Sequence, residues 1–228
     1  MNFKYDISIL IPTIDEEDNV SSVLSLIKKS TNINIKKEII FIDDNSSDKT
    51  VEKINILKKK NKSIKLIKSK KRLGLGHAID QGIKRSSGKY ILCLDCDCAV
   101  SFSDLKKIIN LRTENSVVIG SRYLKNSKII NCSKIKIFLS RMVNIFIAFY
   151  YNIDAKDLTQ SLRIFPKLNG FKPNNLTHPA YFIEMSIFLN NRKLIFKEVP
   201  VFYNNRIAGL TKNSTLNLLK STLSFFIK

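Results

Sequence analysis

Acidic and polar side chains follow three predicted strands of this chain, at the point where each strand ends. One group begins at Asp15 and reads Asp-Glu-Glu, the next begins at Asp43 and reads Asp-Asp-Asn-Ser-Ser-Asp, and the last is Asp95-Cys96-Asp97. In an open parallel sheet, ligands bind beyond the carboxyl ends of the strands. Carboxylates gathered there repel one another unless a cation or a hydrogen-bonding ligand sits among them. Each motif alone also suits a turn or a solvated loop, but together they favour a metal-dependent nucleotide site.

Cysteine and glycine spacings suggest two other chemistries, and both are less favoured. Cys93, Cys96 and Cys98 have a spacing that metal thiolate sites use, but Cys93 lies within a predicted strand, so zinc or iron–sulfur binding is not expected. The step Gly74-Leu75-Gly76 lacks the full spacing of a phosphate loop and predicts a helix start instead.

The elements that must position these residues alternate between short β-branched runs and helical segments. This alternation is typical of βα units on a mainly parallel sheet. Apolar runs predict strands at 7–11, 38–42, 64–67, 90–94 and 117–119. Periodicity predicts helices at 19–29, 48–60, 75–85 and 104–112, the second and fourth capped by Ser47 and Ser103. Beyond Arg122, longer amphipathic segments at 133–151, 180–191 and 214–227 predict an acceptor-binding or membrane-facing region.

Charge is unevenly distributed along the 228 residues, which carry a formal net charge of +20. Residues 1–57 hold 7 basic and 10 acidic groups, 58–72 hold 9 basic groups and no acidic ones, and 125–228 hold 16 basic and 4 acidic groups. Anionic lipid, nucleic acid and phosphorylated substrates are therefore candidate partners. Lysine-rich composition alone is an equal explanation for the 58–72 run.

Hydropathy predicts neither a transmembrane helix nor a signal peptide, so we expect a cytoplasmic chain with reduced cysteines. With 44% hydrophobic residues and few Gly or Pro, the chain predicts one compact domain.

Several of these segments together resemble the dolichyl-phosphate mannosyltransferase branch of the family 2 glycosyltransferases. The segments are PTIDEEDNV, IIFIDDNSSDKT, LGLGHAIDQGI, GKYILCLDCD, SRY, DLTQSLR and EVPVFYNNR. The resemblance implies a GT-A fold of the α/β class, with a mainly parallel sheet flanked by helices and amphipathic C-terminal helices. It also implies a single domain over 1–228, divided into a nucleotide-sugar-binding half at 1–122 and an acceptor- or membrane-facing half at 123–228.

For the donor, the resemblance implies roles at matching positions. Asp95 and Asp97 match the DXD motif and are expected to hold Mg²⁺ or Mn²⁺; with Arg122, they are the expected catalytic residues. The expected donor-binding positions are Pro12, Ile14, Glu16, Ile42, Asp44, Asp95, Cys96, Asp97, Arg122, Arg206 and Lys212. Ile14 replaces the family's usual Tyr, and Ala99 replaces a polar residue near the DXD motif, so base and metal contacts differ from the pattern.

For the acceptor, the resemblance implies a polyprenyl phosphate held by Arg141, Arg163, Arg206 and Lys212. Arginine grips phosphate oxygens through a bidentate fork, which makes the eight arginines more informative than the many lysines. Arg163 has an alternative role, slightly favoured, as the structural partner of Asp157. The aromatic cluster at 146–151 is either core or, as we favour, a surface at the lipid headgroup boundary.

The expected reaction is metal-dependent hexosyl transfer with inversion, giving a β-linked lipid phosphate sugar. GDP-mannose is the leading donor, and UDP-glucose competes with it. An ionised phosphate acceptor needs no strong general base, so positioning and electrostatics can carry the chemistry. We expect the chain on the cytoplasmic face of an anionic membrane, attached peripherally alone or through a membrane-anchoring subunit. The alternatives are a related glycosyltransferase with another acceptor and a basic module that binds membrane or nucleic acid; the acidic strand ends argue against nucleic acid.

Overall fold

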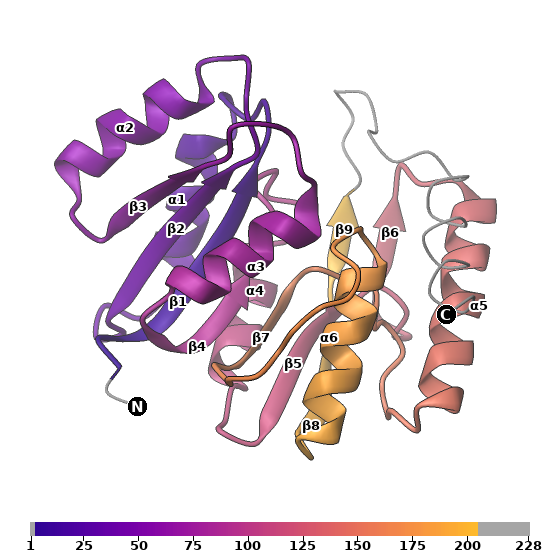
Figure 1. Ribbon diagram of the computed structural model, residues 1–228. Coiled ribbons are helices and arrows are strands. Elements are labelled where there is room, and N and C mark those ends of the chain that lie inside the picture. The colour runs from indigo at the N-terminus through magenta and orange to yellow at the C-terminus, as the bar shows by residue number, and fades with distance from the viewer. Residues whose placement is uncertain (1–2, 205–228) are drawn as a thin grey trace.

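A seven-stranded, mostly parallel sheet forms the centre of the protein, and the computed structural model describes residues 3–204 (Figure 1). The strand order is β3-β2-β1-β4-β7-β5-β8, in which β7 runs antiparallel to both of its neighbours. The strands are β1 (Tyr5–Thr13), β2 (Lys37–Asp43), β3 (Ile64–Lys68), β4 (Gly88–Cys93), β5 (Ser116–Ser121), β7 (Arg163–Pro166) and β8 (Ile195–Pro200). The five predicted strands are confirmed. The sequence did not predict β7, β8 or a small parallel pair, β6 (Lys128–Ile130) and β9 (Phe202–Asn204).

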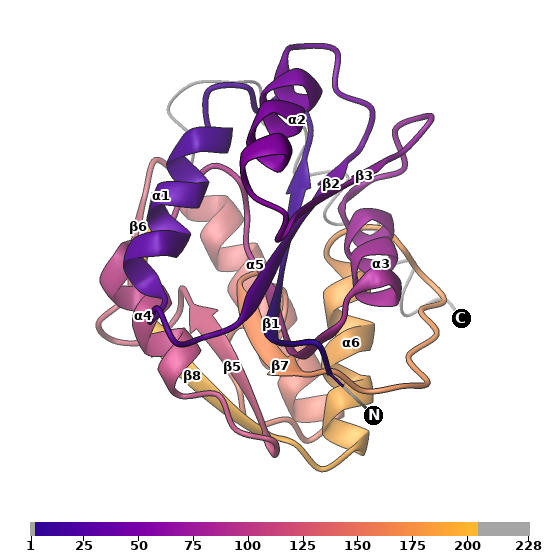
Figure 2. The ribbon, with the colours of Figure 1, turned by 90° about the vertical axis from the view of Figure 1, so that its left-hand side faces the viewer.

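Helices cover both faces of the sheet, which explains why its strands are continuous apolar runs. The helices are α1 (Val20–Ser30), α2 (Thr50–Lys60), α3 (Leu75–Arg85), α4 (Phe102–Asn110), α5 (Lys134–Tyr150) and α6 (Ala180–Asn191). Because side chains alternate along a strand, Ile7 and Ile9 of β1 pack with α1 and α4, whereas Leu10 packs with α3 and α6. Figure 2 shows the sheet between these two helix layers.

Two predicted helix caps are wrong. Ser101, not Ser103, caps α4, because its hydroxyl accepts a hydrogen bond from the Asp104 backbone N–H at 3.1 Å. Ser47 lies outside α2, and its backbone N–H and hydroxyl both donate to the Asp15 carboxylate. The β2–α2 loop is therefore fixed by tertiary contacts rather than by a local cap.

The C-terminal half differs in part from the expected region of three amphipathic segments. Helix α6 is a core helix, with seven of its twelve residues buried, so a membrane-facing surface there is wrong, while an acceptor-binding role for this segment stays a prediction. Helix α5 buries only Asn144 and Ile147 and lies at the periphery of the molecule (Figure 1). The predicted helix at 214–227 lies outside the described residues. Within residues 3–204, no helix is both long and apolar enough to cross a bilayer.

Candidate active site

Carboxylates after β1 and β2 bind the two loops to each other. Ser47 donates its backbone N–H to Asp15 Oδ1 at 2.7 Å, and the backbone N–H of Asp15 donates to Ser46 Oγ at 3.0 Å. Arg72, at the end of the basic run, forms an ion pair with Asp15 at 2.8 Å. Asp15 is therefore compensated by protein groups and does not need the cation that the sequence pattern suggested.

The predicted donor residues Glu16 and Asp44 also have protein partners. Asp44 accepts hydrogen bonds at 2.8 Å from the backbone N–H groups of Leu73 and Gly74, at the entry to α3. Gly74 has φ +93°, a conformation that favours glycine. Glu16 is buried and accepts from Asn19 Nδ2 at 2.7 Å. These carboxylates shape the loops at the carboxyl end of the sheet, beside β1.

Four other predicted donor residues divide into two pairs. Pro12 and Ile14 are partly exposed at the end of β1, where a ligand could reach them. Ile42 and Cys96 are buried and belong to the two core clusters on opposite faces of the sheet. A contact from Ile42 or Cys96 to a nucleotide would therefore use backbone atoms, because both side chains point into the core, and their donor-binding role stays a prediction.

Asp95 and Asp97 form a distinct carboxylate pair just beyond β4. Both are partly buried, and Ser161 Oγ donates to Asp95 Oδ2 at 2.7 Å. Burial raises the pKa of Asp95, and the hydrogen bond from Ser161, which lowers this pKa, offsets only part of the effect. Burial also raises the pKa of Asp97 to about 6, and the charge of Asp95 adds to the effect. The pair carries an electrostatic cost near neutral pH that a bound cation would relieve.

The donor set suits a hard divalent cation, because carboxylate oxygens are the ligands that Mg²⁺ and Mn²⁺ prefer. No group of three or more His, Cys, Asp or Glu within residues 3–204 could hold a metal ion. Asp95 and Asp97 are thus a partial site, and ligand oxygens and water would have to complete it. An open hollow adjoins Asp95; its other lining residues are Leu94, Ala99, Val100, Gln160, Leu162, Val201 and Tyr203.

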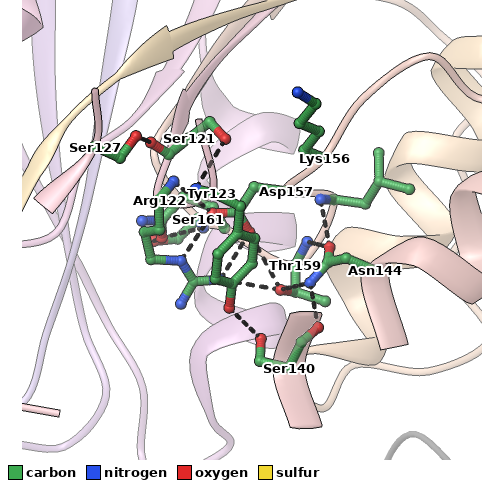
Figure 3. A network of polar contacts seen from close by, with 12 residues as sticks. Ser121, Arg122, Tyr123, Ser127, Ser140, Asn144, Lys156, Asp157, Thr159 and Ser161 are labelled. Carbon is green, nitrogen blue, oxygen red and sulfur yellow. Dashed lines mark hydrogen bonds and ion pairs between the residues drawn. The ribbon is translucent and has the colours of Figure 1, made fainter. Parts of the chain in front are cut away.

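The two bidentate donors of the Arg122 guanidinium do not face this hollow. Its Nε and Nη2 donate to the two oxygens of Asp157 at 2.8 and 2.7 Å, and Nη2 also donates to Thr159 Oγ1 at 3.1 Å (Figure 3). The guanidinium also lies over the rings of Tyr123 and Tyr203. Burial opposes its charge, but the charge of Asp157 outweighs burial and raises the pKa of Arg122. The bidentate edge expected to grip phosphate is thus occupied by Asp157, and Nη1 is the nitrogen left to face a ligand.

Asn144 ties α5 to the same network. Its Oδ1 accepts from the backbone N–H groups of Leu158 and Thr159 at 2.6 and 3.1 Å. Its Nδ2 donates to the Ser140 carbonyl at 2.7 Å, and Tyr123 Oη donates to Ser140 Oγ at 2.7 Å (Figure 3). The peripheral helix is therefore joined through fully buried polar contacts to the loop that leads to the Asp95 partner.

Arg163 is a structural residue of the core, which corrects its expected phosphate contact. It is fully buried, and its guanidinium donates to the carbonyls of Leu158 and Gln160 and to Ser186 Oγ. Burial lowers its pKa to about 10. The alternative ion pair with Asp157 is not formed either, because Arg122 takes that partner.

The remaining predicted acceptor residues are split between surface and undescribed sequence. Arg141 is exposed on α5. Arg206 and Lys212 lie outside the described residues. Sequence reasoning gave no role to Gln160, Ser161, Tyr203 or Asn144, although each stands in or near a segment that supported the resemblance. A polar Asn in the apolar α5 sequence was the clearest signal available.

The mostly parallel α/β sheet and the paired carboxylates after β4 fit the GT-A class of nucleotide-sugar transferases that the sequence resembles. The chain matches the family described as Glycosyl transferase family 2 over residues 8–181 and belongs to that family. The resemblance and the fold class read from the sequence are both confirmed.

Two curated relatives match about half of the chain. A dolichol-phosphate mannosyltransferase of Pyrococcus furiosus is 32% identical over 126 residues, which cover 55% of this chain and 35% of that protein. A dolichyl-phosphate beta-glucosyltransferase of Dictyostelium discoideum is 33% identical over 129 residues, which cover 51% of this chain and 39% of that protein. The matched part thus spans less than two fifths of either relative.

Two solved structures share the fold. A Mycobacterium tuberculosis glucosyl-3-phosphoglycerate synthase, in complex with Mn²⁺, UDP and phosphoglyceric acid, has a TM-score of 0.67 and 14% identity and covers 97% of this chain and 78% of that one. A Pyrobaculum calidifontis mannosyltransferase, in complex with GDP-Man and Mn²⁺, has a TM-score of 0.59 and 14% identity and covers 92% and 59%.

Proposed function

We propose that this protein transfers a hexose from a nucleotide sugar to a polyprenyl phosphate, with inversion at the anomeric carbon. The observation that carries the proposal is the Asp95 and Asp97 pair beyond β4, whose mutual repulsion a cation would relieve. The names of two curated relatives, a dolichol-phosphate mannosyltransferase and a dolichyl-phosphate beta-glucosyltransferase, support this acceptor class. GDP-mannose is the first candidate donor and UDP-glucose the second, because one relative is named a mannosyltransferase and the other a glucosyltransferase.

Asp95 and Asp97 are the residues that would hold Mg²⁺ or Mn²⁺. Bound there, the ion would neutralise negative charge on the diphosphate leaving group. Ser161 keeps one oxygen of Asp95 occupied by a hydrogen bond, which fixes the direction of the carboxylate. Two solved structures with the same fold contain Mn²⁺, which supports a divalent ion in this role.

Bond formation needs little proton transfer. A phosphate oxygen of the acceptor, already ionised near neutral pH, attacks the anomeric carbon as the bond from that carbon to the diphosphate oxygen breaks. The leaving diphosphate takes the electron pair. Nη1 of Arg122 and the exposed Arg141 are proposed phosphate contacts, with Arg206 and Lys212 from the chain beyond residue 204. Their positive charges would place the acceptor for in-line attack.

Helix α5 is the proposed membrane contact through which a polyprenyl acceptor is reached. Its outer surface carries large apolar side chains between 49% and 87% exposed, namely Ile135, Phe138, Met142, Ile145, Phe146, Phe149 and Tyr150. Lys134, Lys136 and Arg141 lie on the same helix, which has no acidic residue. An exposed apolar stripe beside basic groups is typical of helices that lie in the headgroup region of anionic membranes.

The proposal is tested by incubating the purified protein with polyprenyl phosphate and labelled GDP-mannose or UDP-glucose, each with Mg²⁺ or Mn²⁺. We expect label in the organic phase with one of the donors, and a β-linked product. Label that stays in a water-soluble product would refute the acceptor class. No transfer from either donor, by protein shown to be folded, would refute the proposed reaction.

A further inference from the structure

The amide of Gln160 has an unusual environment. Gln160 is only 4% exposed, yet its Nε2 has no hydrogen-bond partner among residues 3–204. Buried amide groups in native proteins nearly always have a partner, since a buried donor without one has lost its hydrogen bonds to water and gained none in return. This nitrogen therefore points to a ligand group that completes it.

The orientation of the amide follows from its neighbour. The backbone N–H of Ser161 lies 2.9 Å from the other atom of the amide, and a backbone N–H can only donate. The atom facing Ser161 must therefore be the oxygen, which turns the NH₂ group away from Ser161. Ser161 Oγ in turn donates to Asp95, so Gln160 and the carboxylate pair belong to one rigid hydrogen-bonded unit.

Gln160 and Asp95 both line the same open hollow beyond β4. Most of its other walls are apolar, provided by Leu94, Ala99, Val100, Leu162 and Val201. A few placed polar groups on apolar walls are typical of small-ligand sites. Here the lining residues include Gln160, whose unpartnered amide NH₂ is a donor, and Asp95, whose carboxylate is an acceptor.

A hydroxyl group satisfies both of these polar groups, because it accepts from the amide and donates to the carboxylate. A phosphate oxygen only accepts, and Asp95 would repel it. The apolar walls suit the C–H faces of a pyranose ring. We propose that Gln160 Nε2 donates a hydrogen bond to a hydroxyl of the transferred hexose and so determines which sugars are accepted. This inference rests on the proposed function, because it assigns a role within the same reaction.

The test pairs variants of Gln160 with donors that each lack one hydroxyl. GDP-mannose or UDP-glucose, whichever the wild type uses, is compared with its 2-, 3-, 4- and 6-deoxy analogues. Gln160→Met removes the amide at similar length, and Gln160→Glu keeps an oxygen toward Ser161 while replacing the NH₂. The matched control is Gln81→Met, at the other glutamine of the chain, on α3.

We expect wild-type kcat/KM to fall about 10- to 100-fold for one deoxy donor, because a buried partner is left unpaired. With the complete donor, kcat/KM of both Gln160 variants should fall by a similar factor. With that deoxy donor, kcat/KM of the variants should fall no more than about 2-fold further, since the substitution and the missing hydroxyl remove the same interaction. Gln81→Met should stay within about 2-fold of the wild type for every donor. Thermal unfolding verifies that the compared variants are folded.

Two results would overturn the inference. In the first, a folded Gln160 variant retains wild-type kcat/KM. In the second, the loss of kcat/KM from the Gln160 variant and the loss from the deoxy donor multiply, whichever hydroxyl the donor lacks. That result is expected if the amide has a structural role or binds water. Either result, obtained while the wild type transfers sugar, leaves the proposed function intact. Absence of transfer by the wild type would instead overturn the proposed function and the inference with it.

Discussion

Replacing Asp157 by Asn should destabilise the protein strongly, because it breaks a buried ion pair on one side only. The carboxylate is fully buried and accepts three hydrogen bonds from Arg122, from the backbone N–H at 2.9 Å, Nε at 2.8 Å and Nη2 at 2.7 Å. Asn has nearly the same shape but presents an NH₂ group to at least one of these donors. The Arg122 side chain, only 19% exposed, would lose its counter-charge.

The expected cost is about 3–5 kcal/mol of unfolding free energy, the usual result of removing one partner from a buried pair. At about 2–4 °C per kcal/mol for a protein of this size, the midpoint should fall by about 6–20 °C. Glu114→Gln is the matched control, because Glu114 and its partner Lys89 are 68% and 41% exposed. That surface pair should contribute little to stability, because solvent screens both charges.

Circular dichroism during heating and urea titration measures both variants. The double variant Arg122→Met with Asp157→Leu should recover much of the lost stability, because two apolar side chains leave no buried charge. The reasoning fails if Asp157→Asn costs no more than Glu114→Gln. It also fails if the double variant is as unstable as Asp157→Asn.

Three further predictions concern the carboxylate pair, the membrane contact and the core arginine. Because folding raises the pKa of Asp97 to about 6, its charge destabilises the metal-free fold above that pH and ceases to do so as pH falls toward 4. At pH 7.5 without metal, Asp97→Asn should therefore unfold at a higher temperature than the wild type, because its unfolding free energy is larger by on the order of 1–3 kcal/mol. At pH 4 the two midpoints should nearly coincide, and a lower midpoint of Asp97→Asn at pH 7.5 would contradict the pKa shift. Phe149→Ser changes a side chain on α5 that is 87% exposed, and it should weaken binding to phosphatidylglycerol vesicles at least about 10-fold in a sedimentation assay. The control Ile33→Ser changes a side chain that is 92% exposed elsewhere and should leave vesicle binding unchanged. Equal effects of the two substitutions would contradict the α5 contact. Arg163→Met should lower the midpoint of thermal unfolding by several degrees, while the folded protein keeps its KM for polyprenyl phosphate. A rise in that KM alone would show that Arg163 contacts the acceptor phosphate, contrary to its burial.

The βα units could be predicted from sequence because local pattern and tertiary environment agree there. In β1, Ile7, Ile9, Leu10 and Ile11 are all fully buried although neighbouring side chains point to opposite faces, which only a doubly covered sheet accommodates. Strand β7 was missed because it has four residues and begins with an arginine, which composition assigns to the surface. Its burial depends on carbonyls of Leu158 and Gln160 that no local pattern reveals.

The candidate site was predictable in part for the same reason. Asp95 and Asp97 follow a recognisable strand, and their position decides their chemistry. The partners of Arg122 were not predictable, because Asp157 lies 35 positions away and competes with phosphate for the same fork. Likewise, Ser47 was expected to cap a helix, but its tertiary partner is Asp15.

The most direct test of the central claim measures the initial rate of hexose transfer to polyprenyl phosphate against the concentration of Mn²⁺, for the wild type and Asp97→Asn. Asp154→Asn, at an exposed acidic residue before the Asp157 loop, serves as the control. We predict that wild-type and control transfer require the ion and saturate with it, and that Asp97→Asn transfers at least about 100-fold more slowly although it is folded. Transfer that persists in excess chelator, or an Asp97→Asn rate within about 3-fold of the wild type, would contradict the assignment of this pair as the metal site.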